Sequence, residues 1–284
     1  MPQRILIAVV TVLGLSALCT SARAAQPAAN PGRMVEAQLL TEQRHITPGK
    51  PIWLALDFTI TSGWHMYWNG QNDTGMPPQL EFELPDGYAI GEVLWPAPER
   101  HVSPGDLIDA TISEHMTLLI RVDAPVNAKQ GADVRIGLKT EWLVCDEACI
   151  LEDAALHVDL PVKVTTPAND PNTAAAPVFA AAREKLPRRL PKENSPATIK
   201  WEGTSVSIEA PSAEELVFFP HEEGAVVEYI LKDCFAKGDR LKFRVKDAGD
   251  STKRLSGVLQ IRRSGKKPEY YNVSLPVPGE SKPG

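Results

Sequence analysis

The chain has few cysteines and no excess of basic residues, and these two shortages exclude several classes of protein. Only 4 of its 284 residues are cysteine, too few for a small scaffold held by disulfides, so apolar cores must hold the fold. The 30 Lys and Arg residues are outnumbered by 36 Asp and Glu residues. Because nucleic-acid binding needs a basic face, this balance argues against a nucleic-acid partner. The length predicts two domains.

After its N-terminal segment the chain also lacks an apolar run long enough to cross a membrane. That segment has a positive charge at Arg4, an apolar stretch from Ile5 to Leu18 and a small-x-small site at Ala22-Arg23-Ala24. The pattern is typical of a secretory signal peptide, residues 1–24. We therefore expect a soluble, exported protein with no membrane span in its mature chain, in a compartment where disulfides persist.

Alternation of apolar and polar residues is the main secondary-structure signal, and it predicts a mostly β protein. The clearest run extends from Ile52 to Ile60 and has the pattern of a strand with one buried face. Comparable runs follow at 118–122, 134–144 and 156–164. Turn residues such as Pro85-Asp-Gly87 separate them. Many short strands of this kind are typical of an antiparallel sandwich, which we expect at residues 33–165.

A change of composition then separates a second block. Residues 166–196 are rich in Ala, Pro, Asn and Lys, which is typical of a linker. A short helix is expected there, from Val178 to Leu186. Strand patterns resume at 197–278 and predict a second, smaller β-sandwich. The expected fold is therefore all-β, with two antiparallel β-sandwich domains joined by an Ala/Pro-rich linker that contains a short helix.

Two cysteines, Cys145 and Cys149, lie four positions apart at the end of an alternating apolar run. In a straight strand such residues are about 13 Å apart, whereas a disulfide joins Cα atoms within roughly 4.4–6.8 Å. If the two are bonded, the backbone must turn between them. So small a loop stabilises the fold by only about 2 kcal/mol, and strained or exposed disulfides exchange most readily. The pair is a candidate redox site, with a static loop clip as the alternative.

A zinc site is the third interpretation of the pair. Two thiolates need two more ligands, and His157 and Cys234 are only lone candidates, so we assign no metal. Carboxylates surround the pair, and no Lys or Arg occurs between residues 140 and 162. Negative charge disfavours a thiolate, so these surroundings favour the disulfide and predict a dithiol that gives up its electrons readily. The acidic residues are Glu141, Asp146, Glu147, Glu152 and Asp153.

Several motifs resemble, in order, those of one known family. They are Gly63-Trp-His-Met-Tyr-Trp68, Asp73-Thr-Gly75-Met-Pro77, Leu94-Trp-Pro-Ala-Pro98, Trp142-Leu-Val-Cys145-x-x-x-Cys149-Ile and Phe218-Phe-Pro220. The chain resembles the periplasmic N-terminal domain of DsbD-type thiol:disulfide interchange proteins, in particular the ScsB-like subgroup associated with suppression of copper sensitivity. The resemblance covers about residues 33–278. Leu151 stands where the family has a proline, and the family's membrane and thioredoxin-like domains do not follow before Gly284.

The resemblance implies immunoglobulin-like sandwiches and a thiol:disulfide oxidoreductase of the protein-disulfide reductase type, without a cofactor. Cys145 and Cys149 would be its catalytic pair, in the periplasm. They would take electrons from a membrane thiol transporter, here a separate partner, and pass them to thioredoxin-fold proteins. Apolar cover would limit stray exchange at such a site. The candidates for shielding the disulfide are Trp64, Tyr67, Trp68 and Trp142. Ordinary core or strand-edge aromatics are the alternative interpretation of Trp64, Tyr67 and Trp68.

A non-catalytic protein remains the alternative, namely a periplasmic β-sandwich that binds a partner or handles copper and whose disulfide is only structural. Thioether and imidazole suit Cu(I), and His65-Met66 and His115-Met116 are the dipeptides that offer both. Ordinary strand residues are the simpler interpretation of these dipeptides. Cys234 is most simply a small buried residue, and an intermolecular disulfide is the second interpretation.

Overall fold

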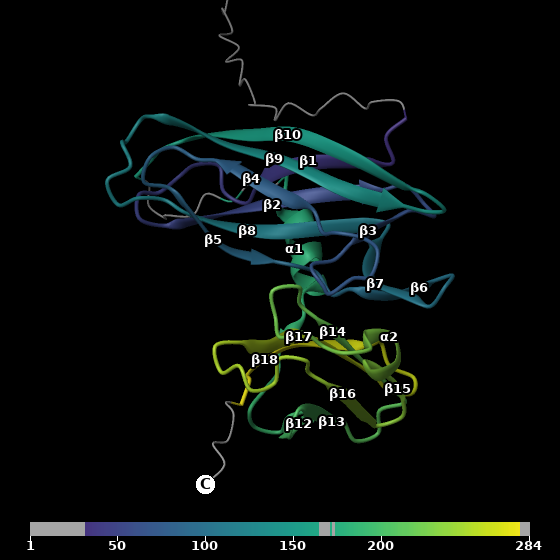
Figure 1. Ribbon diagram of the computed structural model, residues 1–284. Coiled ribbons are helices and arrows are strands. Elements are labelled where there is room, and N and C mark those ends of the chain that lie inside the picture. Colours follow the sequence, from purple (N-terminus) through teal and green to yellow (C-terminus); the bar gives the residue numbers. More distant parts are fainter. Residues whose placement is uncertain (1–31, 165–170, 172–173, 279–284) are drawn as a thin grey trace, which may run out of the picture.

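The computed structural model describes residues 32–164, 171 and 174–278, so the expected signal peptide lies outside the described residues. Strands dominate the described part of the chain, which contains only two short helices. The strands form two β-sandwiches, the first above the second in the view of Figure 1. The expected all-β fold is therefore confirmed. No helix in these residues is long and apolar enough to span a membrane.

The first sandwich consists of two antiparallel sheets. One has the order β1-β2-β8-β5, with β1 (Val35–Thr41), β2 (Pro51–Ile60), β8 (His115–Asp123) and β5 (Ala89–Leu94). The other has the order β10-β9-β3-β7-β6, with β10 (Cys149–Pro161), β9 (Asp133–Cys145), β3 (His65–Tyr67), β7 (Leu107–Ser113) and β6 (Glu99–Ser103), and β4 (Gln79–Glu83) also pairs with β9.

The core of this domain lies between the two sheets. Alternate residues of β2 meet alternate residues of β9 there, because successive side chains of a strand point to opposite faces. Phe58 of β2 and Trp142 of β9 are almost fully buried, and their rings meet edge to face at 5.1 Å. The apolar residues of the alternating patterns therefore face the core, as expected.

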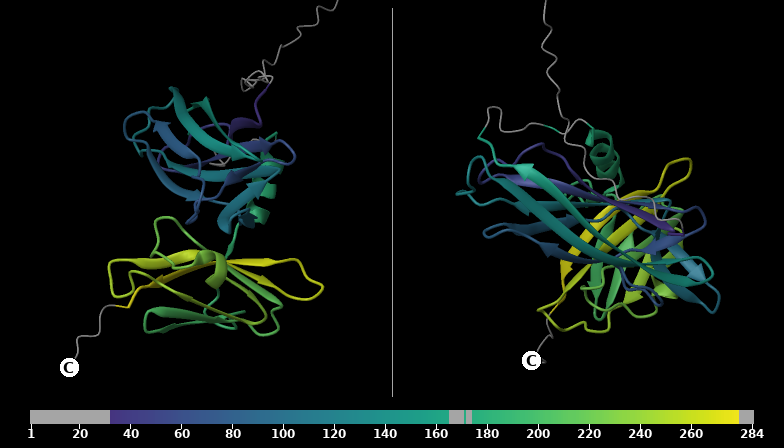
Figure 2. Two further views of the ribbon diagram at one scale, coloured as in Figure 1. Left: turned by 45° about the vertical axis from the view of Figure 1, so that its right-hand side comes forward. Right: turned by 90° about the horizontal axis from the view of Figure 1, so that it is seen from above.

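The outer face of the first sheet is also covered, which the sequence pattern did not predict. Helix α1 (Ala176–Lys185) packs on it, and Phe179 and Ala182 form a buried cluster with Ala55 and Leu119 (Figure 2). Ala55 is 0% exposed, so β2 is buried on both faces at this point. Part of the expected linker is thus a packed element of the first domain, and its helix begins two residues before the expected start.

The second sandwich follows directly. Its larger sheet has the order β11-β18-β17-β14-β15, with β11 (Arg188–Arg189), β18 (Glu269–Pro276), β17 (Arg254–Arg262), β14 (Glu215–Pro220) and β15 (Phe235–Lys237). The smaller has the order β12-β13-β16, with β12 (Thr198–Glu202), β13 (Ser205–Glu209) and β16 (Arg240–Arg244). A single helical turn, α2 (Ile230–Asp233), precedes β15. The strand β11 lies inside the expected linker, yet it pairs with β18.

The two sandwiches share an apolar contact. Val217, Phe219 and Val258 of the second domain belong to the core cluster of the first. Trp68, the residue after β3, stacks on His221 with ring centroids 4.7 Å apart. The contact therefore lies close to the chain that leaves β3.

Candidate functional site

Cys145 and Cys149 form a disulfide at the tip of the β9–β10 hairpin. They are opposed in the register of the two strands, and their Cα atoms are 4.2 Å apart. Only residues 146–148 lie between the strands, so the turn that a bond between these cysteines required is present. The bond therefore joins two neighbouring strands at their ends.

The two cysteines differ in exposure. Cys145 is 2% exposed, whereas Cys149 is exposed. Cys145 pairs on its other side with His65 of β3 and so lies inside the sheet, while β10 is the edge strand. A thiolate from another protein therefore reaches Cys149 more easily than Cys145.

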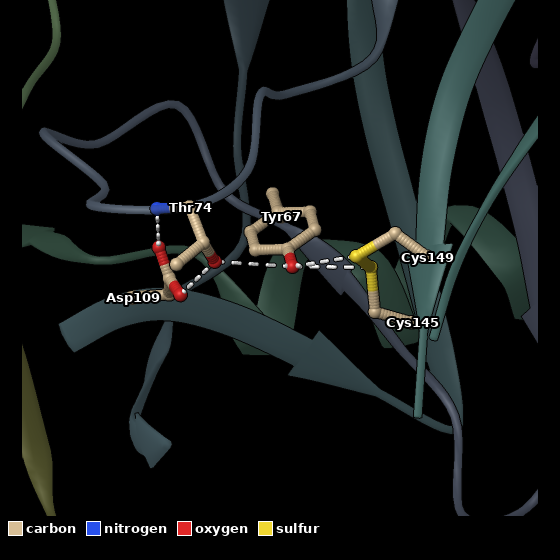
Figure 3. The surroundings of a disulfide bond; sticks show 5 residues. All are labelled: Tyr67, Thr74, Asp109, Cys145 and Cys149. Atoms are coloured by element: carbon tan, nitrogen blue, oxygen red, sulfur yellow. Dashed lines mark hydrogen bonds between the residues drawn. A yellow bond between two sulfur atoms is a disulfide. The ribbon is translucent and has the colours of Figure 1, made fainter. Parts of the chain in front are cut away.

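Tyr67 covers the disulfide (Figure 3). Its hydroxyl donates a hydrogen bond to Cys145 Sγ at 3.1 Å and lies 3.5 Å from Cys149 Sγ. Burial raises the pKa of Tyr67, so the hydroxyl keeps its proton at neutral pH and remains a donor. A phenol in this position can stabilise a thiolate on Cys145, because hydrogen bonds to charged groups are the stronger ones.

The chain between β3 and β4, residues 68–78, holds Tyr67 in place; we call it the β3–β4 connection. Thr74 Oγ1 lies 3.4 Å from the Tyr67 hydroxyl and donates to the buried carboxylate of Asp109 at 2.6 Å. The backbone of Gly75 lies against the Tyr67 ring, and a Cβ at this position would be 2.1 Å from a ring carbon. Only glycine therefore fits there.

His65 is the neighbour of Cys145 on the other side. Its ring lies 5.5 Å from the Tyr67 ring and 4.5 Å from that of His101. Burial, and then the nearby His101, lower the pKa of His65. At neutral pH the imidazole is consequently neutral and places no positive charge beside Cys145.

Residues 36–161 match the profile of a family described as thiol:disulfide interchange protein DsbD, N-terminal. Both cysteines, Tyr67 and the β3–β4 connection lie within this match. Residues 36–161 form a DsbD-type N-terminal domain. The resemblance found in the sequence is thereby confirmed for this part of the chain, and with it a thiol–disulfide exchange module in the general sense.

One solved structure agrees with the fold of this chain. The N-terminal periplasmic domain of ScsB from Proteus mirabilis is 14% identical, with 86% of this chain and 94% of that chain covered and a TM-score of 0.54. The Neisseria meningitidis DsbD N-terminal domain in the reduced form is 13% identical, with 43% and 84% covered and a TM-score of 0.27. No curated protein matches the chain.

The four residues expected to shield the disulfide lie in different places. Tyr67 contacts both sulfur atoms of the disulfide. Trp68 is buried, and its Nε1 donates to the Pro96 carbonyl at 2.9 Å. Trp142 lies in the core beside Phe58, and Trp64 is half-buried against the same core. Among the four, Tyr67 is therefore the residue that the structure brings to the disulfide.

Not all of the expected carboxylates surround the pair. Asp146 and Glu147 are exposed in the turn between the cysteines. Glu152 instead lies on the core side of β10, where it accepts hydrogen bonds from the backbone N–H groups of Met34 at 2.7 Å and Val35 at 3.2 Å. Fewer of the expected carboxylates therefore lie near the disulfide than the sequence suggested. Sequence reasoning missed one carboxylate of the site, the buried Asp109.

The remaining candidates are the two His-Met dipeptides and Cys234. Met66 and Met116 are fully buried in the core, and the histidines before them point the other way, as strand alternation requires. In the part of the chain that the structure describes, no group of three or more His, Cys, Asp and Glu residues could hold a metal. Cys234 is 2% exposed in the second core, and burial raises the pKa of its thiol.

Proposed function

We propose that this protein is a periplasmic thiol–disulfide exchange module of the protein-disulfide reductase type, with Cys145 and Cys149 as its catalytic pair. One observation carries the proposal. In a DsbD-type domain, a disulfide at a hairpin tip joins an exposed cysteine to a buried one, and a phenol hydroxyl contacts the buried sulfur. A static clip needs neither the exposed sulfur nor the hydroxyl.

The difference in exposure between the two cysteines supports a separate role for each. In the dithiol form, the Cys149 thiolate attacks a partner disulfide, forms a mixed disulfide and releases one partner thiolate. The Cys145 thiolate then attacks Cys149 Sγ, releases the second partner thiolate and re-forms the Cys145–Cys149 bond. The partner gains two electrons, and the chain loses them. Tyr67 stabilises the Cys145 thiolate through the hydrogen bond that it already makes to this sulfur.

The charges at the site favour donation of electrons. Asp146 and Glu147 lie between the cysteines, and the neutral His65 does not offset them. Negative charge disfavours the thiolate form and therefore the reduced state at neutral pH. We expect a reduction potential at or below that of the glutathione couple, measured by equilibration with glutathione buffers. A potential well above that couple would contradict donation.

The partners follow from the family and from the export signal. We propose that a membrane thiol transporter supplies the electrons and that a thioredoxin-fold periplasmic protein receives them. The signal expected at residues 1–24 supports the location. The ScsB structure with the same fold is itself described as periplasmic.

Single-cysteine variants in a Cys234→Ala background test the proposal. Each variant is mixed with a bacterial thioredoxin that lacks its resolving cysteine. The remaining cysteine of this thioredoxin carries a thionitrobenzoate leaving group. Release of that group and a non-reducing gel report the mixed disulfide. Cys145→Ala, which keeps Cys149, is expected to form it at least tenfold faster than Cys149→Ala. If neither variant forms it, and reduced thioredoxin leaves the wild-type bond intact, the disulfide is a structural clip.

A further inference from the structure

The β3–β4 connection contacts the exchange site at one end and the second domain at the other. Thr74 and Gly75 hold Tyr67 over Cys145. A few residues earlier, Gly70 forms an isolated β-bridge with His221 of the second domain. The second domain therefore touches the segment that covers the disulfide.

Gln71 makes most of the polar contacts across this boundary. Its Nε2 donates to the carbonyls of His221 and Ala225, each at 3.0 Å, and its Oε1 accepts from the backbone N–H of Val227 at 3.0 Å. Its own backbone N–H donates to the Pro220 carbonyl at 3.0 Å. One side chain thus bonds to three backbone groups of the second domain.

The segment that carries these groups, residues 221–227, is itself bonded to the sheet of the second domain. The His221 N–H donates to the Ser256 carbonyl at 3.0 Å and the Ala225 N–H to the Arg254 carbonyl at 2.9 Å, both in β17. Trp68 adds an apolar contact, because it stacks on His221 and meets Phe219 at 6.4 Å. The β3–β4 connection is therefore attached to the segment that follows β14, which is itself bonded to β17.

The attachment extends from Gln71 to Tyr67 through consecutive residues. Asn72 Oδ1 accepts from the Ala110 N–H at 2.8 Å, and Asp73 Oδ2 accepts from the Ile108 N–H at 2.8 Å. Thr74 follows with its bonds to Asp109. Asn72, Asp73 and Thr74, which lie between Gln71 and the Tyr67 hydroxyl, are thus each held by a hydrogen bond to β7.

We propose that the second domain acts as a clamp on the β3–β4 connection and that Gln71 is its positioning residue. The clamp keeps Tyr67 over Cys145, so exchange proceeds through Cys149. This role rests on the proposed exchange function, but the cover of Cys145 is measurable without any partner. The clamp gives the second domain a part in the chemistry of the exchange site.

Pulsed alkylation of the reduced full chain tests the clamp. Iodoacetamide is added briefly, and mass spectrometry reports the extent of reaction at each cysteine. In the wild type, Cys149 is expected to react at least tenfold faster than Cys145. Gln71→Ala is expected to raise the rate at Cys145 about tenfold and to leave the rate at Cys149 within twofold. Gln71→Met, which keeps the volume of the side chain, is expected to do the same with a native unfolding transition.

Arg100→Met is the matched control. Arg100 also crosses the domain boundary, since its Nη2 donates to the Leu231 carbonyl at 3.0 Å and its guanidinium lies over the Phe235 ring. This contact does not involve the β3–β4 connection, so the rate at Cys145 is expected to stay unchanged. Equal effects of Gln71→Met and Arg100→Met, or no effect of either Gln71 variant, would overturn the clamp. Failure of the thioredoxin trapping would instead overturn the proposed function and leave the alkylation result standing.

Discussion

The two domains place their cysteines in opposite environments. In the first, Cys149 is exposed at a hairpin tip, and its bonded partner Cys145 receives a hydrogen bond from a phenol. In the second, Cys234 is 2% exposed within an apolar cluster, and burial raises the pKa of its thiol. A reactive sulfur needs access and a polar partner. The position of each cysteine in its sheet, and not the presence of a thiol, therefore makes the first domain the candidate for exchange chemistry.

The largest difference is expected in thiol reactivity. In the reduced native chain, Cys234 should be alkylated at least a thousandfold more slowly than Cys149, because it is both buried and poorly ionised. Peptide mass spectrometry after timed iodoacetamide treatment measures both rates. In guanidinium chloride the two rates should become similar. Native rates within tenfold of each other would remove the distinction between the domains.

The hydroxyl of Tyr67 accounts for the next effect. Tyr67→Phe keeps the ring over the disulfide but removes the bond to Cys145 Sγ, and a hydrogen bond to a charged group contributes about 1.5–3 kcal/mol. Reduction of the disulfide by dithiothreitol should therefore slow about ten- to hundredfold. Tyr88→Phe is the control, since the buried Tyr88 hydroxyl has no hydrogen-bond partner in the described residues. A similar slowing in both variants would exclude a specific role for Tyr67.

Replacing the disulfide cysteines and replacing Cys234 should both lower stability, but only the first should affect exchange. Replacing both Cys145 and Cys149 by Ala should lower the free energy of unfolding by about 2 kcal/mol, the value for so short a closed loop. Cys234→Ser should cost about 1–3 kcal/mol, because it places a hydroxyl in an apolar cluster. Denaturant unfolding measures both changes. Only the first should abolish exchange; loss of exchange in folded Cys234→Ser would contradict the account.

The smallest expected effect is a pH dependence of stability. Burial is the main cause that lowers the pKa of His65 in the first domain and of His221 at the boundary. The unfolded chain takes up these protons near pH 6.5, whereas the folded chain does so only at lower pH. This stabilisation is therefore fully present above pH 6.5 and is lost as the pH falls below it. Thermal unfolding at pH 7.5 and 5.5 measures the loss of stability. In His221→Asn the loss between these two pH values should be smaller.

Much of the fold was predictable because it depends on local alternation. The strands around Ile52 and Trp142 and the turn between the cysteines follow from short-range patterns. The cover of the outer face at Ala55 was not predictable, since α1 lies more than a hundred residues further along the chain. The same reason explains Trp68, which neighbours Tyr67 in sequence but packs against the second domain.

The candidate site was predictable only in its cysteines and in Tyr67. Thr74 and Asp109 are 35 residues apart in sequence, and no local pattern joins them. The Asp73-Thr-Gly75 motif was visible, but the reason for its glycine, the Tyr67 ring beside it, becomes clear only in three dimensions. Gln71 carried no sequence signal, because its partners lie about 150 residues away.

The central claim is that Cys145–Cys149 exchanges with thioredoxin-fold proteins. The most direct test is the second-order rate constant for reaction of the oxidised chain with reduced bacterial thioredoxin, compared with that for reduced glutathione at the same pH. Alkylation of quenched samples and a gel shift measure both. We expect thioredoxin to react at least a hundredfold faster than glutathione. Equal rate constants, or a disulfide that thioredoxin leaves intact, would contradict it.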